Sequence, residues 1–283
     1  MSTNQNQYVG VFDSGVGGLS VIREIHKLLP LAPLYYIADQ AHVPYGKRQL
    51  DEILAFSLSI SRFLISKGAS VIVVACNTAS AAALSALRET LPGTPFVGME
   101  PAVKPATQQT ENGVVGVLAT PATFQGRMYS TLVERFAQNV QLLTNTLPGL
   151  VEAVERGELD SPATRRILEA AIKPMLAEGV DTLVLGCTHF PFVLPLIRAI
   201  AGPDVKVIDP APAIARRTAY LLEQSPISFA DGAEAKTVFA TTGNAAKFRS
   251  AIHNLLNIET EPIQLAWNET SVQLTEMRSQ ICH

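Results

Sequence analysis

The feature that most constrains the fold is a short segment, V-I-V-V-A-C-N-T-A-S-A, at residues 71–81. Its apolar first half predicts a buried strand, and the alanine-rich residues that follow predict a helix. Cys76 is therefore placed at the carboxyl end of a strand and close to a helix N-terminus. An open parallel sheet collects ligands at this edge, where unpaired backbone N–H groups favour negative charge. We expect this thiol to ionise more readily than a free cysteine, whose pKa is about 8.5.

A second segment of the same design, T-L-V-L-G-C-T-H, lies at residues 182–189 and places Cys187 after another predicted strand. A helix is expected to follow it, as after Cys76. Two cysteines at equivalent strand ends are unlikely to arise by chance. The pair predicts two thiols that face each other across one small-molecule site.

Composition limits the protein class. The chain has 283 residues, which favours one large or two medium domains. Apolar residues make up 47% and charged residues 17%, a balance typical of a large core around parallel strands covered on both faces. The 22 basic and 25 acidic residues leave a net charge of −3, which argues against a general nucleic-acid binder. No apolar run approaches the roughly 20 residues of a membrane span, and the polar N-terminus lacks a signal segment, so we expect a cytoplasmic protein.

The three cysteines do not form a disulfide framework, and a reducing cytosol would keep them as thiols. They also lack the spacing of a zinc site, so we expect no metal. Cys282 stands next to the last residue and is assigned no role, because chain ends usually fray.

The first predicted strand, residues 8–12, runs into D-S-G-V-G-G at residues 13–18 and then into an amphipathic helix that ends near Leu29. Glycines in such a turn let backbone amides approach an anion closely. The spacing does not match G-x-G-x-x-G, so an ordinary turn capped by Asp13 is an equally good interpretation.

Strands and helices then alternate to the end of the chain. Further strands are expected at 34–38, 96–99, 114–118, 141–145, 206–208 and 237–241, and helices at 50–67 and 243–256. Thr120 and Pro121, Ser161 and Pro162, and Asp209 are expected to begin three more helices, and Pro174 to kink or end the second of these. The polar loop at residues 40–48 is either a surface turn or a lid. The sequence therefore predicts an α/β fold of two similar halves, each with one thiol at a central strand end.

Two thiols at one pocket are compatible with a disulfide, a metal site, a nucleophile with its resolving thiol, or a paired acid and base. A disulfide needs Cα atoms within roughly 7 Å, a geometry that is lost when a ligand lies between the sulfurs. In the acid–base alternative, one thiolate takes a proton from a carbon and the other thiol returns one to the opposite face. Asp13, Glu155 and His189 are the nearest candidates to assist the thiols, although His189 fits a packed helix start equally well.

Several segments together resemble the glutamate racemase family. In chain order, between residues 9 and 217, they are G-V-F-D-S-G-V-G-G-L-S-V, A-D-Q-A-H-V-P-Y-G-K-R, V-V-A-C-N-T-A-S-A, G-V-L-A-T-P-A-T, L-V-L-G-C-T-H-F-P and I-D-P-A. The resemblance implies a cofactor-independent two-base racemase that interconverts L- and D-glutamate and supplies D-glutamate for peptidoglycan. It implies two pseudo-symmetric αβα domains with mostly parallel sheets and the active site in the cleft between them. The domains would comprise residues 1–98 with 210–283, and residues 99–209.

Carried over by position, the resemblance makes Cys76 and Cys187 the two bases, assisted by Asp13, Glu155 and His189. Neutral donors at turns and helix starts suit the two carboxylates of a dicarboxylic amino acid, although each donor alone could be a simple cap. The substrate-binding residues implied are Asp13, Ser14, Pro44, Tyr45, Gly46, Asn77, Thr78, Thr120, Thr123, Thr188 and His189.

One stretch departs from the family pattern. In L-P-G-L-V-E-A-V-E, Leu147 and Glu152 replace a cysteine and a proline that are common in the family. The assisting glutamate then aligns with Glu155, and Glu152 is the alternative.

The sequence is also compatible with two other functions. An aspartate or hydantoin racemase would share the two-thiol architecture, and a two-lobed amino-acid binding protein would use the cysteines only as pocket lining. The high apolar content is also compatible with a homodimer.

Overall fold

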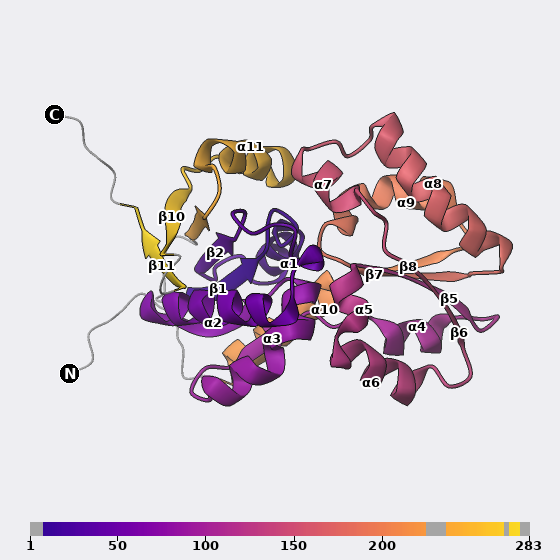
Figure 1. Cartoon of the computed structure of the whole chain (residues 1–283), viewed down its shortest axis with the longest axis horizontal. Helices are drawn as coiled ribbons and strands as arrows, with labels where there is room; N and C mark the ends of the chain where they lie inside the picture. The colour runs from indigo at the N-terminus through magenta and orange to yellow at the C-terminus, as the bar shows by residue number, and fades with distance from the viewer. Residues whose placement is uncertain (1–7, 225–235, 269–271, 278–283) are drawn as a thin grey trace.

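The computed structural model describes residues 8–224, 236–268 and 272–277, so Cys282 lies outside the described residues. The described chain builds two sheets, one with strand order β11-β10-β9-β2-β1-β3-β4 and one with order β6-β5-β7-β8. In Figure 1 the first sheet, with α2 and α11, occupies the left of the molecule, and the second sheet, with α8 and α9, occupies the right. Every pair of adjacent strands is parallel except β10 and β11, which confirms the predicted α/β fold with mostly parallel sheets.

Helices cover both faces of the first sheet. Its strands are β1 (Tyr8–Asp13), β2 (Leu34–Ala38), β3 (Ala69–Val74), β4 (Phe96–Gly98), β9 (Thr237–Thr241), β10 (Ile263–Asn268) and β11 (Gln273–Glu276). Side chains alternate between faces along each strand, so Val9 and Val11 share an apolar cluster with Ile22, whereas Phe12 joins a cluster on the other face. The first cluster contains residues of α1 (Leu19–Leu28), α10 (Ala211–Glu223) and α11 (Ala245–Leu256), and the second contains residues of α2 (Leu50–Ser66) and α3 (Asn77–Thr90).

The second sheet is smaller and wholly parallel. It contains β5 (Val114–Ala119), β6 (Gln141–Asn145), β7 (Thr182–Gly186) and β8 (Lys206–Ile208), flanked by α4 (Val103–Gln109), α5 (Pro121–Gln125), α6 (Arg127–Phe136), α7 (Leu150–Glu155), α8 (Pro162–Ala177) and α9 (Leu194–Ala201). The cluster that holds Val9 also contains Leu185 of β7 and Ile172 of α8, so one apolar core runs through both halves. The domain boundaries at 98/99 and 209/210 stay a prediction.

The structure adds detail at three places along the chain. The loop at residues 40–48 contains a short 3-10 helix, η1 (Tyr45–Lys47). Pro174, which was expected to kink or end its helix, does not end α8, because the helix continues to Ala177. The helix expected directly after Cys187 begins as a 3-10 helix, η2 (Phe190–Val193), and only then continues as α9.

Asp209 was expected to be the N-cap residue of the next helix, α10, but it lies one position before the N-cap residue. The helix begins at Ala211 with Pro210 as its N-cap residue, and Asp209 Oδ1 accepts a hydrogen bond from Ala211 N at 2.9 Å.

No helix within the described ranges 8–224, 236–268 and 272–277 is long and apolar enough to cross a membrane.

Candidate active site

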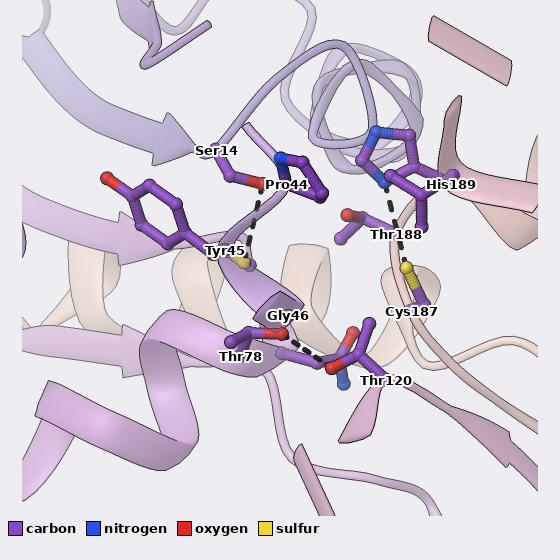
Figure 2. Close-up of a pocket in the computed structure, with 12 residues that line it drawn as sticks. Ser14, Pro44, Tyr45, Gly46, Thr78, Thr120, Cys187, Thr188 and His189 are labelled. Carbon is purple, nitrogen blue, oxygen red and sulfur yellow. Dashed lines mark hydrogen bonds between the residues drawn. The ribbon is translucent and has the colours of Figure 1, made fainter. Parts of the chain in front are cut away.

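A pocket lies between the two sheets, at the carboxyl ends of their strands. It encloses a cavity of about 20 Å³, room for about one water molecule. Figure 2 shows Ser14 and Tyr45 on one side, Cys187, Thr188 and His189 on another, and Thr78 and Thr120 along a third. The lining residues are Ser14, Pro44, Tyr45, Gly46, Cys76, Asn77, Thr78, Thr120, Val151, Cys187, Thr188 and His189.

The pocket brings together most of the residues that the sequence suggested. Asp13, Thr123 and Glu155 are not among the lining side chains, and each instead bonds to a lining residue from behind. Val151 was not predicted, because an apolar residue on a short helix carries no signal in the sequence that separates it from core. The roles of all these residues stay predictions.

Cys76 is the N-cap residue of α3 and is almost completely buried. Its sulfur accepts a hydrogen bond from Ala79 N at 3.4 Å, and its thiol donates to Ser14 Oγ at 3.9 Å. Burial raises the pKa of this thiol well above its ordinary value, and the negative charge of Asp13 raises it further. The expectation that Cys76 ionises readily was therefore wrong for the free protein, because one N–H donor at the helix start does not offset burial beside a carboxylate.

Asp13 lies behind Cys76 at the end of β1 and is fully buried. Its carboxylate accepts hydrogen bonds from Ser14 N at 2.8 Å, Gly18 N at 2.5 Å and Thr188 Oγ1 at 3.1 Å. Burial raises the pKa of Asp13, although the charge of His189 and hydrogen bonds with Cys76 and Ser14 act in the opposite direction. The backbone amides of the glycine-rich turn therefore hold a carboxylate of the protein itself.

The glycines of this turn serve close packing between the two halves. A Cβ atom on Gly15 would overlap the carboxylate of Glu155, and one on Gly17 would overlap Thr188 Oγ1 and the His189 ring. Val16 N between them donates a hydrogen bond to Glu155 Oε1 at 2.8 Å. The turn thus lies directly against the residues that surround Cys187.

Cys187 is backed by a histidine and a glutamate. His189 Nδ1 lies 3.7 Å from Cys187 Sγ, and His189 Nε2 lies 2.7 Å from Glu155 Oε1. Burial lowers the pKa of His189, but its bonds to Cys187 and Glu155 and their charges outweigh this and raise it well above the ordinary value. Burial would raise the pKa of Glu155, yet hydrogen bonds from His189, Val16 and Gln40 lower it overall. The imidazole is thus held as a cation between a carboxylate and a sulfur.

Hydroxyl groups form the third side of the pocket. Thr78 Oγ1 lies 2.8 Å from Thr120 Oγ1 and 3.4 Å from Thr123 Oγ1, and the last two oxygens are 2.9 Å apart. Thr78 belongs to α3 and the other two to the start of α5, so this cluster also crosses between the halves. Each hydroxyl has one O–H group, which can donate either to a neighbour or to a ligand, and lone pairs that can accept.

Asn77 presents an unpaired amide beside Cys76. Its side chain lines the pocket and is buried, and neither Oδ1 nor Nδ2 has a hydrogen-bond partner. A buried amide without partners costs about 1–3 kcal/mol. The arrangement therefore indicates a ligand that supplies the missing partners.

Both described cysteines are free thiols. Across residues 8–224, 236–268 and 272–277, no three His, Cys, Asp or Glu side chains are grouped as ligands for a metal ion.

Comparison with known proteins identifies the family. The model of the Asp/Glu/Hydantoin racemase family matches residues 10–218. A glutamate racemase of Roseiflexus sp. (strain RS-1) is 47% identical over 90% of this chain and 94% of its own. A glutamate racemase isoform from Bacillus anthracis superposes with a TM-score of 0.83 at 33% identity, covering 92% of this chain and 98% of that chain. The Escherichia coli glutamate racemase, solved with L-glutamate and the activator UDP-MurNAc-ala, superposes with a TM-score of 0.80 at 32% identity, covering 96% and 100%.

Proposed function

The chain belongs to the Asp/Glu/hydantoin racemase family, and we propose that it interconverts L- and D-glutamate by proton transfer at Cα between Cys76 and Cys187. The observation that carries this proposal is the placement of the thiols. Each follows a strand of a different sheet, and both are free and line one pocket. This is the arrangement that a two-base mechanism requires.

The reaction proceeds in two proton transfers. One cysteine, as thiolate, removes the proton from Cα, and the electron pair of the C–H bond passes into the α-carboxylate. The other cysteine, as thiol, delivers its proton to the opposite face of Cα and becomes the thiolate. The product is the mirror image of the substrate. Loss of a proton to solvent from the first sulfur and gain of one by the second return both to their starting states.

Different groups support the two sulfurs. Burial and Asp13 keep Cys76 protonated in the free protein. The His189 cation lies 3.7 Å from Cys187 Sγ and stabilises negative charge there. Glu155 holds His189 from its far side. Glu152 is not part of this chain of contacts, because its carboxylate pairs with Lys47 at 2.5 Å on the surface.

Neutral donors bind the two carboxylates of the substrate. Asn77 offers an unpaired amide, and Thr78 and Thr120 offer hydroxyl groups. A donor that meets the charge developing on the α-carboxylate contributes about 3 kcal/mol to the transition state. The relatives named glutamate racemases favour glutamate over aspartate or a hydantoin as the substrate. The D-glutamate formed would supply peptidoglycan synthesis, as the family resemblance implies.

Incubation with L-glutamate in heavy water tests the proposal. We expect D-glutamate that carries one solvent deuterium at Cα, because each proton is exchanged at a thiol. A binding protein with the same pocket would return unlabelled L-glutamate, and that result would exclude the racemase. Parallel incubations with L-aspartate and a hydantoin test the alternative substrates. The cytoplasmic location and the homodimer stay predictions.

A further inference from the structure

A second buried carboxylate, Asp39, lies next to the pocket and has no part in the proton transfers. It follows β2 directly and is fully buried. One oxygen accepts hydrogen bonds from the Tyr45 hydroxyl at 2.6 Å and lies 2.9 Å from His42 Nδ1. The other accepts from the Thr242 hydroxyl and from Trp267 Nε1, each at 2.7 Å.

The partners of Asp39 come from segments that are far apart in the sequence. Thr242 follows β9 and Trp267 lies near the end of β10, and both strands run parallel to β2 in the same sheet. Their carboxyl ends therefore meet at the edge that also carries the pocket. Thr242 Oγ1 accepts a further bond from Ala41 N at 3.0 Å, so the loop that begins there is fastened to the C-terminal part of the chain.

Tyr45 connects this cluster to the pocket. Its ring lines the pocket, and in Figure 2 its hydroxyl points away from Cys187, Thr188 and Thr120. The hydroxyl bonds to Asp39, and burial beside that carboxylate raises the pKa of Tyr45 well above its ordinary value. The hydroxyl therefore remains protonated and anchors the ring. The neighbours Pro44 and Gly46, which also line the pocket, are fixed with it.

Trp267 packs against two other aromatic rings of this cluster. Its ring is half-buried and packs against His42 and Phe56, with ring centroids 5.2 and 5.5 Å away. His42 in turn stacks on Phe56 at 3.9 Å, and Phe56 packs against Tyr45 at 6.0 Å. Trp267 does not line the pocket, so it can influence a ligand only through these groups.

We propose that Trp267 is a positioning residue, which sets the substrate-binding segment Pro44–Gly46 through Asp39 and Tyr45. The expected change in KM for glutamate rests on the proposed function. The expected change in how readily a reagent reaches the pocket thiols rests on the geometry alone. The C-terminal strand β10 thereby becomes part of the machinery that binds substrate, although it contributes no side chain to the pocket.

Trp267→Phe tests the kinetic consequence, because it removes the N–H donor and keeps an aromatic ring. We expect KM for glutamate to rise about tenfold, the equivalent of one hydrogen bond, with kcat changed less than about twofold. Asp39→Asn should raise KM similarly. The double variant should be no worse than Asp39→Asn alone, because both changes act through one carboxylate.

Tyr35→Phe is the matched control. Tyr35 donates a hydrogen bond to Glu276 at 3.3 Å and so also ties β2 to the C-terminal hairpin, but it has no contact with Asp39 or the pocket. We expect its KM to equal that of the unchanged protein. An equal rise in Tyr35→Phe would mean that loosening the hairpin is sufficient, and would overturn the positioning role of Trp267.

Alkylation of the pocket thiols gives a second measurement that needs no activity. Iodoacetamide labelling, mapped by peptide mass, should modify Cys76 several times faster in Trp267→Phe than in Tyr35→Phe at equal Tm. If the unchanged protein fails to racemise glutamate, the proposed function falls and the labelling rates still decide the inference. If it racemises glutamate and Trp267→Phe matches it in both KM and labelling, the inference falls and the proposed function stands.

Discussion

Glu155 and His189 form a buried ion pair, with 2.7 Å between Glu155 Oε1 and His189 Nε2, directly behind the sulfur of Cys187. The pKa of the glutamate is lowered and that of the histidine is raised, so both partners are charged across the neutral range. The pair also accepts a hydrogen bond from Val16 in the other half of the molecule. The stability of the fold therefore depends on the charges of the two residues that lie beside Cys187.

The first prediction is a pH-dependent loss of stability in Glu155→Gln. The lowered pKa of Glu155 gives stability that is present above its unfolded value of about 4.3 and is lost as pH falls through the folded value. The raised pKa of His189 gives stability that is present below about 6.5 and is lost as pH rises through its folded value. The variant should therefore lose most near pH 5–6, by about 2 kcal/mol, and progressively less toward acid and alkaline pH.

Urea unfolding across this pH range measures the effect, and Glu152→Gln is its control on the same helix. Glu152 pairs with Lys47, which is 72% exposed, so its loss should change the free energy of unfolding by less than about 0.5 kcal/mol. Equal losses of unfolding free energy in the two variants would show that the buried pair contributes no more to stability than the exposed one.

The second prediction concerns the two thiols. Cys76→Ala and Cys187→Ala should each reduce racemisation by about a thousandfold or more, because each removes one of the two proton-transfer groups. Both variants should keep the circular dichroism spectrum of the unchanged protein. Cys282→Ala, outside the described residues, should leave the rate unchanged. Full activity in either pocket variant would remove that cysteine from the mechanism.

The third prediction separates binding from stability at Asn77. Its amide is buried without partners in the free protein, so Asn77→Ala should not lower Tm, yet it should raise KM for glutamate about tenfold. Asn244→Ala is the opposite control. Asn244 caps α11 by accepting from Lys247 N at 2.9 Å, so its loss should cost about 1 kcal/mol of stability and leave KM unchanged. A destabilised Asn77→Ala with normal KM would assign Asn77 to the fold.

The position of the thiols could be predicted from sequence because it depends on short-range patterns. An apolar run followed by a cysteine and a helix places Cys76 and Cys187 at the carboxyl ends of β3 and β7. The two strands belong to different sheets, and the pocket lies where the carboxyl ends of both sheets meet. The charge state of Cys76 could not be predicted in the same way. It depends on burial and on Asp13, which is distant in the sequence, and these outweigh the nearby helix N-terminus.

The cluster around Asp39 could not be predicted from the sequence either, because its members are far apart in the chain. Its partners Thr242 and Trp267 reach it only because β9 and β10 join the first sheet beside β2. The segment I-Q-L-A-W-N at residues 263–268 did not predict β10, because its alternation of apolar and polar residues is short and its tryptophan faces a polar group. Pairing between distant strands is a property of the whole sheet, and local periodicity does not contain it.

The final prediction concerns the contact between Gly17 and the residues around Cys187. Gly17→Ala adds one methyl group, which would overlap Thr188 Oγ1 and the His189 ring, so one or both of these side chains must shift. A displacement near 1 Å at a catalytic centre can reduce the rate about a hundredfold, and we expect a loss of kcat of that size. Gly93→Ala is the matched control, because a Cβ atom there meets nothing within 4 Å. Steady-state kinetics of both variants decide the matter: normal kcat in Gly17→Ala would show that the pocket tolerates the shift of these side chains.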